Sequence, residues 1–319
     1  MRVLPVYLVC FGILNSCLAF FQPKFLRNNY NVPQMMSTSE KLTVQPIKTI
    51  SGEYTLPGSK SLSNRVLLLS ALSEGTTKIE NLLESADIRY MIEALKQLKI
   101  PLTEEPEKKT VIVTGRGGPI DVDKETLNLG NAGTAMRPLC GVLCAGQGSF
   151  VLDGVARMRE RPIIDLVDGL SQLGVNVKCS PTGCPPVEIE ARGIKGGVAE
   201  ISGKISSQFL SALLMTGPLA SGEVVLKIKD ELMSAPYVHM TMNLMRKFGA
   251  SVQSENDKVF RVQPGKYISP KNVFIEGDAS SASYFLAGAA ITGGRVTVFG
   301  CGSERLQLYL ISSFFSCLC

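Results

Sequence analysis

The feature that most constrains the fold of this 319-residue chain is a repeat that runs through its body. Each copy has a glycine turn with small polar residues, an apolar helical stretch, a second glycine turn and an alternating strand. The corresponding positions Lys60, Gly133, Ser206 and Ser280 are 73, 73 and 74 residues apart. Spacing this regular indicates a fold that repeats one supersecondary unit.

The pattern within each copy predicts a βαβαββ unit. Strands are expected at 76–82, 148–154, 223–228 and 295–300, with closing strands at 110–115 and 259–264. A second helix is expected in each complete unit, at 87–100, 161–175 and 237–250. The predicted fold class is therefore α/β (α+β), with three complete units.

The fourth copy ends after its first helix and strand and continues as the apolar segment RLQLYLISSFFSCLC. A lone β-α-β remnant cannot bury its own faces. We expect a complete three-repeat domain over 59–276. Residues 40–58, with a strand in KLTVQPIK, and 277–319 would form the remnant of a second domain with an aberrant apolar tail. The sequence is either a fragment or has last residues from an altered reading frame or splice event.

The first 39 residues have the composition of targeting sequence. Residues 1–19 join the basic Arg2 to an apolar run and a small-x-small site at 17–19, the pattern of a signal peptide rather than of a stable membrane span. Residues 20–39 are basic without acidic residues, as transit peptides are. Together they predict import into a plastid acquired from an engulfed alga. Plain secretion is the alternative, and cysteines without disulfide spacing argue against it.

Composition disfavours several classes of function. The chain has one histidine, His239, and nine cysteines without a C-x-x-C pair, which disfavours metal clusters and histidine-dependent triads. The net charge of +5 is too diffuse to indicate nucleic-acid binding, and neither a Walker motif nor G-x-G-x-x-G is present. We expect buried thiols, a structural His239, no metal and no organic cofactor.

The stretch LPGSKSLSNR places Lys60 and Arg65 at the start of a predicted helix. Cations there oppose the helix dipole and are unfavourable unless an anion meets them. We interpret them, beside three serines, as a grip for phosphate or carboxylate. Capping of the helix is the simpler role for a serine or threonine at such a start, and it suffices for Thr134 and Ser280.

The second and third units add further donors at helix starts. Arg157, Arg159 and Arg161 directly precede Pro162, which is expected to mark a helix start. Arginine binds carboxylate and phosphate in a bidentate manner, although a solvated basic loop explains any one of the three equally well. The third unit supplies the neutral donors Ser206, Ser207, Gln208, Ser234 and Tyr237. The pattern predicts small, multiply anionic substrates.

Six segments in order, from about residue 42 to about 302, resemble the 5-enolpyruvylshikimate-3-phosphate synthase family. They are LPGSKSLSNR, LGNAGTAMRPL, RMRERPI, SSQFLSALLM, SAPYVHMTMNLMRKFG and EGDASSASYFLAGAA. The sister family, UDP-N-acetylglucosamine enolpyruvyl transferase, shares the fold but has different motifs. The resemblance implies an inside-out α/β barrel of two domains, each of three βαβαββ units, with substrates in the cleft between them.

The resemblance also implies a reaction. The enolpyruvyl group of phosphoenolpyruvate would move to the 5-hydroxyl of shikimate 3-phosphate, releasing phosphate, on the route to chorismate and the aromatic amino acids. No cofactor, metal or nucleic acid is implied, and we expect a monomer without a stable membrane span in the mature chain. The unaltered GTAMRP at 133–138 would resemble the form that is sensitive to glyphosate.

Residue roles follow by matching the motifs. Lys60 would contact both substrates and is the catalytic candidate. Gly133, Arg161 and Gln208 would also bind phosphoenolpyruvate. Shikimate 3-phosphate would contact Ser61, Arg65, Ser206, Ser207, Gln208, Ser234 and Tyr237.

The chain departs from the family at its C-terminal end. The aspartate base and the further lysine and arginine contacts of the family's other domain have no counterpart here. We therefore expect the chain as written to turn over very slowly or not at all. The alternative is a non-catalytic fragment or splice product that at most binds shikimate 3-phosphate.

Overall fold

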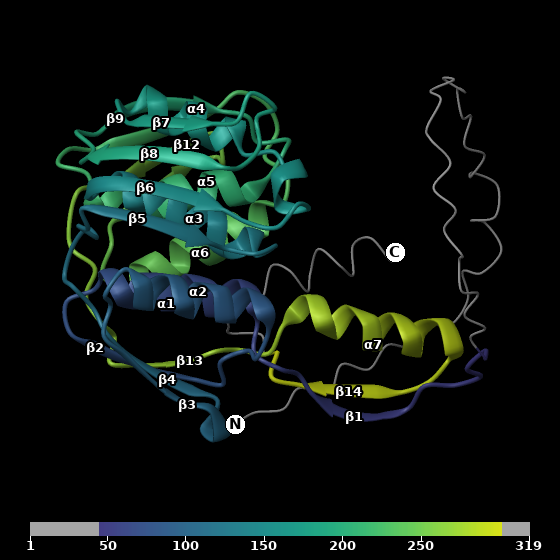
Figure 1. Ribbon diagram of the computed structural model, residues 1–319. Coiled ribbons are helices and arrows are strands. Elements are labelled where there is room, and N and C mark those ends of the chain that lie inside the picture. Colours follow the sequence, from purple (N-terminus) through teal and green to yellow (C-terminus); the bar gives the residue numbers. More distant parts are fainter. Residues whose placement is uncertain (1–44, 302–319) are drawn as a thin grey trace, which may run out of the picture.

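The structure is a computed structural model that describes residues 45–301. Its larger body has three four-stranded sheets on the outside and six helices between them (Figure 1). The signal peptide and transit peptide expected in 1–39, and the tail from residue 302 onward, lie outside the described residues. The sheets and helices follow the three predicted units.

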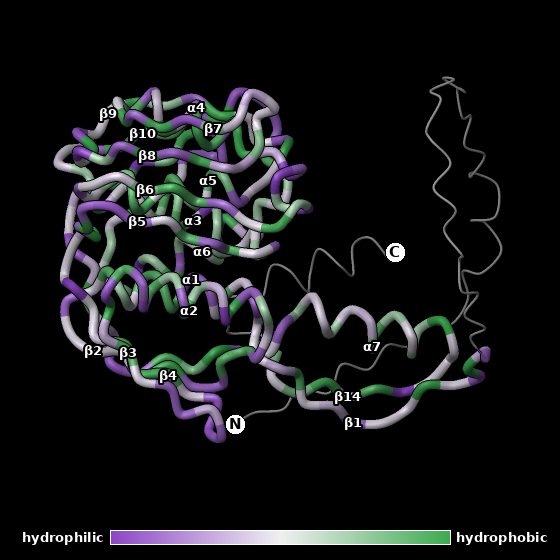
Figure 2. The backbone as a smooth tube through the Cα atoms, viewed as in Figure 1, coloured by the Kyte–Doolittle hydropathy of each residue, from purple (hydrophilic) through white to green (hydrophobic). Residues whose placement is uncertain are grey.

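The first helix of each unit lies in the core. These helices are α1 (Lys60–Leu72), α3 (Gly133–Cys144) and α5 (Ser207–Thr216). Nearly every residue of each is buried, and α3 packs against both α1 and α5. Beyond their polar first turns, their sequences are mostly apolar on all sides, as a helix enclosed by other elements requires, and Figure 2 shows the apolar segments along them.

The second helix of each unit is amphipathic, and it packs against a first helix and against strands of the sheets. These are α2 (Ala86–Gln97), α4 (Ile164–Gln172) and α6 (Ala235–Lys247), so the three predicted second helices are confirmed. The expectation that Pro162 marks a helix start is wrong. A short 3-10 turn, η2 (Met158–Glu160), comes first, and α4 begins two residues beyond the proline.

Each sheet has a parallel pair of strands at one end and antiparallel pairing elsewhere. The strand orders are β13-β2-β4-β3, β5-β6-β8-β7 and β11-β12-β10-β9. The strands of the first sheet are β2 (Thr76–Glu80), β3 (Leu102–Glu105), β4 (Thr110–Thr114) and β13 (Asn272–Phe274). Those of the second are β5 (Lys124–Asn128), β6 (Gln147–Asp153), β7 (Asn176–Cys179) and β8 (Val187–Arg192). Those of the third are β9 (Gly197–Ile201), β10 (Val224–Ile228), β11 (Val252–Glu255) and β12 (Val259–Val262). The predicted strands in these units are confirmed, and the late strand β13 completes the first sheet in parallel register with β2.

A smaller body consists of α7 (Ala279–Thr292) and the parallel pair β1 (Gly52–Thr55) and β14 (Val296–Phe299). Two adjacent segments join it to the larger body, through hydrogen bonds from Ser59 N to Glu276 O (2.8 Å) and from Asp278 N to Pro57 O (3.0 Å). The strand expected in KLTVQPIK is wrong for its described part, 45–48, which pairs with no other segment. The first strand begins at Gly52.

Two observations concern the whole of residues 45–301. No helix there has the length and apolar character needed to cross a membrane, and no group of three or more His, Cys, Asp or Glu is placed to hold a metal ion. The cysteines described are free thiols, three of them buried. His239 lies 3.1 Å from Asp257 of the β11–β12 turn.

Candidate active site

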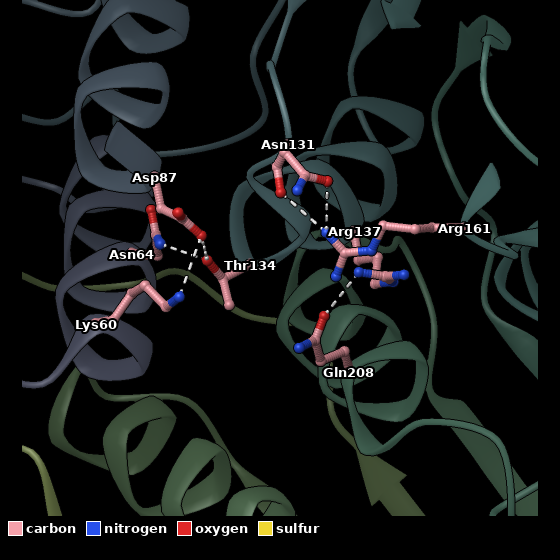
Figure 3. A network of polar contacts seen from close by, with 8 residues as sticks. All are labelled: Lys60, Asn64, Asp87, Asn131, Thr134, Arg137, Arg161 and Gln208. Carbon is pink, nitrogen blue, oxygen red and sulfur yellow. Dashed lines mark hydrogen bonds and ion pairs between the residues drawn. The ribbon is translucent and has the colours of Figure 1, made fainter. Parts of the chain in front are cut away.

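Polar contacts join the first turns of α1, α2, α3 and α5, where most of the predicted site residues lie (Figure 3). Helix starts carry unpaired N–H groups and partial positive charge. The contacts form two groups in this region. One surrounds Lys60 and the other surrounds Gly133.

The first group is centred on one carboxylate oxygen. Oδ1 of Asp87, in the first turn of α2, lies 3.5 Å from Nζ of Lys60. The same oxygen accepts a hydrogen bond from the Thr134 hydroxyl (3.1 Å), which in turn accepts one from Nδ2 of Asn64 (2.8 Å). The Lys60 side chain is 44% exposed, so its ammonium remains accessible to a ligand.

The second group encloses Gly133, the first residue of α3. A Cβ added there would lie 2.3 Å from Nη1 of Arg137 and 2.5 Å from Nη2 of Arg161. Nη1 of Arg161 donates to the backbone carbonyl of Asn131 (2.9 Å) and to its side-chain oxygen (3.2 Å). Two guanidinium groups thus converge on a backbone position that only glycine leaves open.

Arg137 is buried within the second group. Its Nη1 donates to Oε1 of Gln208 (3.0 Å), its Nη2 donates to the Pro162 carbonyl (3.4 Å), and its Nε has no partner within residues 45–301. Burial, and then the charge of Arg161, lower the pKa of Arg137 to about 10. The Arg137 guanidinium also lies over the ring of Phe209, 5.5 Å from its centroid.

Arg65 is likewise buried, between α1, α5 and α6. It donates to the Thr241 hydroxyl (2.9 Å), the Ser61 carbonyl (3.0 Å) and the Ser211 hydroxyl (3.4 Å). Burial lowers the pKa of Arg65 to about 10. In this structure the Arg65 guanidinium is bonded to protein oxygens and the residue is only 4% exposed, so it is not open to the predicted contact with a ligand. The predicted Ser61 is half-buried beside it.

The predicted donors of the third unit occupy two helix starts. Ser206 is the N-cap of α5, and its hydroxyl accepts a hydrogen bond from Gln208 N (3.2 Å). Ser207 follows and is buried. Ser234 stands at the N-cap of α6 in the left-handed region (φ 57°), and Tyr237 shares a 3.0 Å hydrogen bond with Ser280 of α7.

Ion pairing separates the three arginines of the basic loop. Arg157 pairs with Glu160 (2.6 Å) and Arg159 with Asp153 (2.5 Å). Arg161, by contrast, has no carboxylate within ion-pair distance in the described part of the chain. The interpretation of the loop as an ordinary solvated segment therefore holds for the first two, and Arg161 alone stands in the candidate site.

Thr134 and Ser280 were expected to cap helices, and neither does so. The Thr134 hydroxyl bonds to Asp87 and makes no cap. Ser280 is capped rather than capping, since its N–H donates to Asp278. The Ser59 hydroxyl at the start of α1 is buried without a partner in the described residues.

Sequence reasoning missed five members of the two groups: Asn64, Asp87, Asn131, Thr134 and Arg137. Arg137 could have been found, because it is a cation near a helix start like Lys60 and Arg65. Asp87 carried no such signal. Its meeting with Lys60 depends on the packing of α2 against α1, which the sequence pattern does not specify.

The arrangement can bind anions. Arg65, Arg137 and Arg161 form no ion pair with a carboxylate of residues 45–301, and their acceptors are neutral oxygens. A guanidinium buried without a counter-charge is costly, and a second one beside it adds repulsion. A phosphate or carboxylate at these helix starts would offset both costs.

Comparisons with known proteins agree with this chemistry. The family described as EPSP synthase (3-phosphoshikimate 1-carboxyvinyltransferase) matches residues 44–314. The chain is 55% identical to the chloroplastic 3-phosphoshikimate 1-carboxyvinyltransferase of Arabidopsis thaliana, over 86% of this chain and 56% of that protein. It is 51% identical to the enzyme of that name from Shewanella amazonensis, over 84% of this chain and 63% of that protein.

A solved structure of EPSP synthase from Acinetobacter baumannii superimposes with a TM-score of 0.68 at 30% identity, covering 80% of this chain and 56% of that one. The mixed α/β fold and the enolpyruvyl transferase architecture are thereby confirmed. The chain spans somewhat more than half the length of the relatives it matches. It belongs to the EPSP synthase (3-phosphoshikimate 1-carboxyvinyltransferase) family.

Proposed function

We propose that the helix starts of this chain bind shikimate 3-phosphate and phosphoenolpyruvate, and that the whole protein transfers the enolpyruvyl group from the second to the first. The observation that carries the proposal is the convergence of Arg137 and Arg161 on the open backbone at Gly133, without a carboxylate to neutralise them. Paired cations of this kind suit a ligand with phosphate and carboxylate groups.

The two groups of contacts suggest how the substrates divide the site. Phosphoenolpyruvate would lie against Gly133 and Arg161, and shikimate 3-phosphate against Ser61, Arg65 and the donors that begin α5 and α6. Lys60 would contact both, as the one accessible ammonium of the first group. Gln208 lies between the two sides, because its helix start adjoins Arg137.

The chemistry of these residues is positioning and electrostatics. The 5-hydroxyl of shikimate 3-phosphate must approach the enol carbon of phosphoenolpyruvate. Binding both substrates side by side in the correct orientation makes this step effectively unimolecular and so lowers its barrier. Negative charge on the departing phosphate would be stabilised by Lys60 and Arg161. The same residues offer donors only, so we propose neither a metal nor an organic cofactor.

The names of the plant relatives bear on the cellular location. Those from Arabidopsis thaliana and Petunia hybrida are named chloroplastic, and this supports a plastid location for the present protein. Import through a signal peptide and a transit peptide, as in algae with secondary plastids, is our proposal for residues 1–39. We further propose a monomer whose three-repeat domain covers 59–276.

Titration of the purified chain with both substrates, followed by a phosphate-release assay, tests the proposal. Phosphate release that requires both substrates supports transfer by the chain itself. Saturable binding of shikimate 3-phosphate without release supports the binding-only function. Absence of binding contradicts the proposal.

A further inference from the structure

The side-chain amide of Gln208 has a fixed partner at one end only. Its Oε1 accepts a hydrogen bond from Nη1 of Arg137 at 3.0 Å. The amide nitrogen is turned away from Arg137 (Figure 3), and no acceptor for it exists within residues 45–301. Gln208 is half-buried in the first turn of α5, so its amide nitrogen is an unused donor at these helix starts.

The chemistry of Arg137 determines which end of the amide is free. A guanidinium has five N–H donors and no acceptor, whereas an amide has a donor end and an acceptor end. Rotating the Gln208 amide by half a turn would set its NH₂ group against the N–H groups of Arg137. The pair therefore holds the carbonyl inward and the NH₂ outward.

Arg137 adds positive charge beside Gly133 but is poorly placed to touch the substrate itself. It is 6% exposed, donates to the Pro162 carbonyl and lies over the Phe209 ring. Burying a cation without a carboxylate is costly, and an apolar side chain of similar size often serves packing as well or better. A role in packing alone does not account for an arginine here.

We propose that Arg137 is a positioning residue that fixes the Gln208 amide with its NH₂ group toward the bound anion. Gln208 then donates to a phosphate or carboxylate oxygen at the joined starts of α3 and α5. The identity of that anion, shikimate 3-phosphate, rests on the function proposed above. The orientation of the amide rests only on the contacts of the two side chains.

Calorimetric titration with shikimate 3-phosphate tests the proposal in three variants of the full chain. Arg137→Met releases the amide, and we expect about a tenfold loss of affinity. Gln208→Glu keeps Arg137 but presents an acceptor to the ligand, so we expect a larger loss of affinity together with an unchanged or higher melting temperature. Arg157→Gln removes an equal charge from an exposed pair and should bind within about twofold of the native chain.

A second measurement needs no ligand. The side-chain ¹⁵N–¹H₂ signal of Gln208 should move toward the position of a free glutamine amide in Arg137→Met, while that of Gln172 stays unchanged. Arg137→Lys, which keeps a donor-only cation, should restore part of the native shift and of the affinity.

The proposal is overturned if folded Arg137→Met binds shikimate 3-phosphate like the native chain. It is overturned equally if Gln208→Glu does so, or if the Gln208 signal does not respond to Arg137→Met. Should the native chain not bind this ligand at all, the proposed function fails, and the amide signal alone then decides whether Arg137 orients Gln208.

Discussion

At the scale of single residues, the role of each arginine in the basic loop follows from whether its hydrogen-bond acceptor is a carboxylate or a neutral oxygen. Arg157 and Arg159 have carboxylate partners on the surface, and exposed ion pairs of this kind contribute little to the free energy of unfolding. Arg161 finds only the oxygens of Asn131. Its uncompensated charge beside Arg137 is a cost that an anionic ligand removes.

This difference predicts how two substitutions in one loop act on binding. Arg161→Gln should weaken binding of phosphoenolpyruvate, measured with shikimate 3-phosphate present, by about tenfold or more, because a charge-assisted hydrogen bond to the ligand is lost. Arg157→Gln is the matched control and should change that affinity by less than about twofold. Equal effects of the two substitutions would mean that only the overall charge of the loop matters.

A second residue-scale prediction concerns acid stability. Hydrogen bonding and ion pairing with Lys96, and then the charge of Arg89, hold the pKa of Glu104 below its usual range. A carboxyl group with a lowered folded-state pKa stabilises the fold above its unfolded pKa, about 4.3 for glutamate. That contribution is lost as the pH falls through the lower folded-state pKa.

Glu104→Gln should therefore lower the free energy of unfolding at pH 7 by less than about 1 kcal/mol, since its two basic partners are about half exposed and solvent screens the interaction. The difference from the native chain should shrink as the pH falls through the lowered folded-state pKa of Glu104, in urea unfolding followed by circular dichroism. Glu107→Gln, an exposed carboxylate outside these ion pairs, is the control. A Glu104→Gln effect that is as large at pH 3 as at pH 7 would contradict the assignment.

At the scale of elements, α3 contains two glycines with different surroundings. A Cβ at Gly133 would meet the ends of the Arg137 and Arg161 side chains, which can move. A Cβ at Gly141 would lie 2.5 Å from Oγ1 of Thr216 and 3.1 Å from the Ala212 carbonyl, where α3 packs against α5. The first glycine opens the site, whereas the second permits close packing of two helices.

Alanine at each position should separate these two roles. Gly141→Ala is expected to lower the free energy of unfolding by about 1–3 kcal/mol, because the buried helix pair must shift apart. Gly133→Ala should leave the melting temperature nearly unchanged but displace the guanidinium groups and weaken binding of phosphoenolpyruvate. Thermal unfolding and titration of both variants check this, and a stability loss at Gly133 as large as that at Gly141 would refute it.

Also at this scale, the origin of the correct and incorrect predictions is visible. The helices and strands of the three units were predictable, because each has a clear period and glycine turns at its ends. Two helix caps were not, since Thr134 finds Asp87 from another helix and Ser280 is itself capped by Asp278. Capping was inferred from local sequence, and contacts between helices determined the outcome.

At the scale of the whole molecule, the repeat explains why the predicted site residues come together. Equivalent helices of equivalent units start on the same side of the core, so residues about 73 positions apart become neighbours. This arrangement brings Lys60 near Thr134, and Arg137 near Gln208. The repeat does not specify which side chains touch, and for that reason the contact of Asp87 with Lys60 was found only in the structure.

The measurement that tests the account most directly is a calorimetric titration of the chain with shikimate 3-phosphate, with Lys60→Met and Glu93→Gln beside the native protein. We predict one saturable site, affinity at least about tenfold lower for Lys60→Met, and unchanged affinity for Glu93→Gln, which removes an exposed charge from α2. Binding should also weaken as salt is added, because charge holds the ligand. No binding by the native chain, or equal binding by Lys60→Met, would contradict the claim that these helix starts form an anion site.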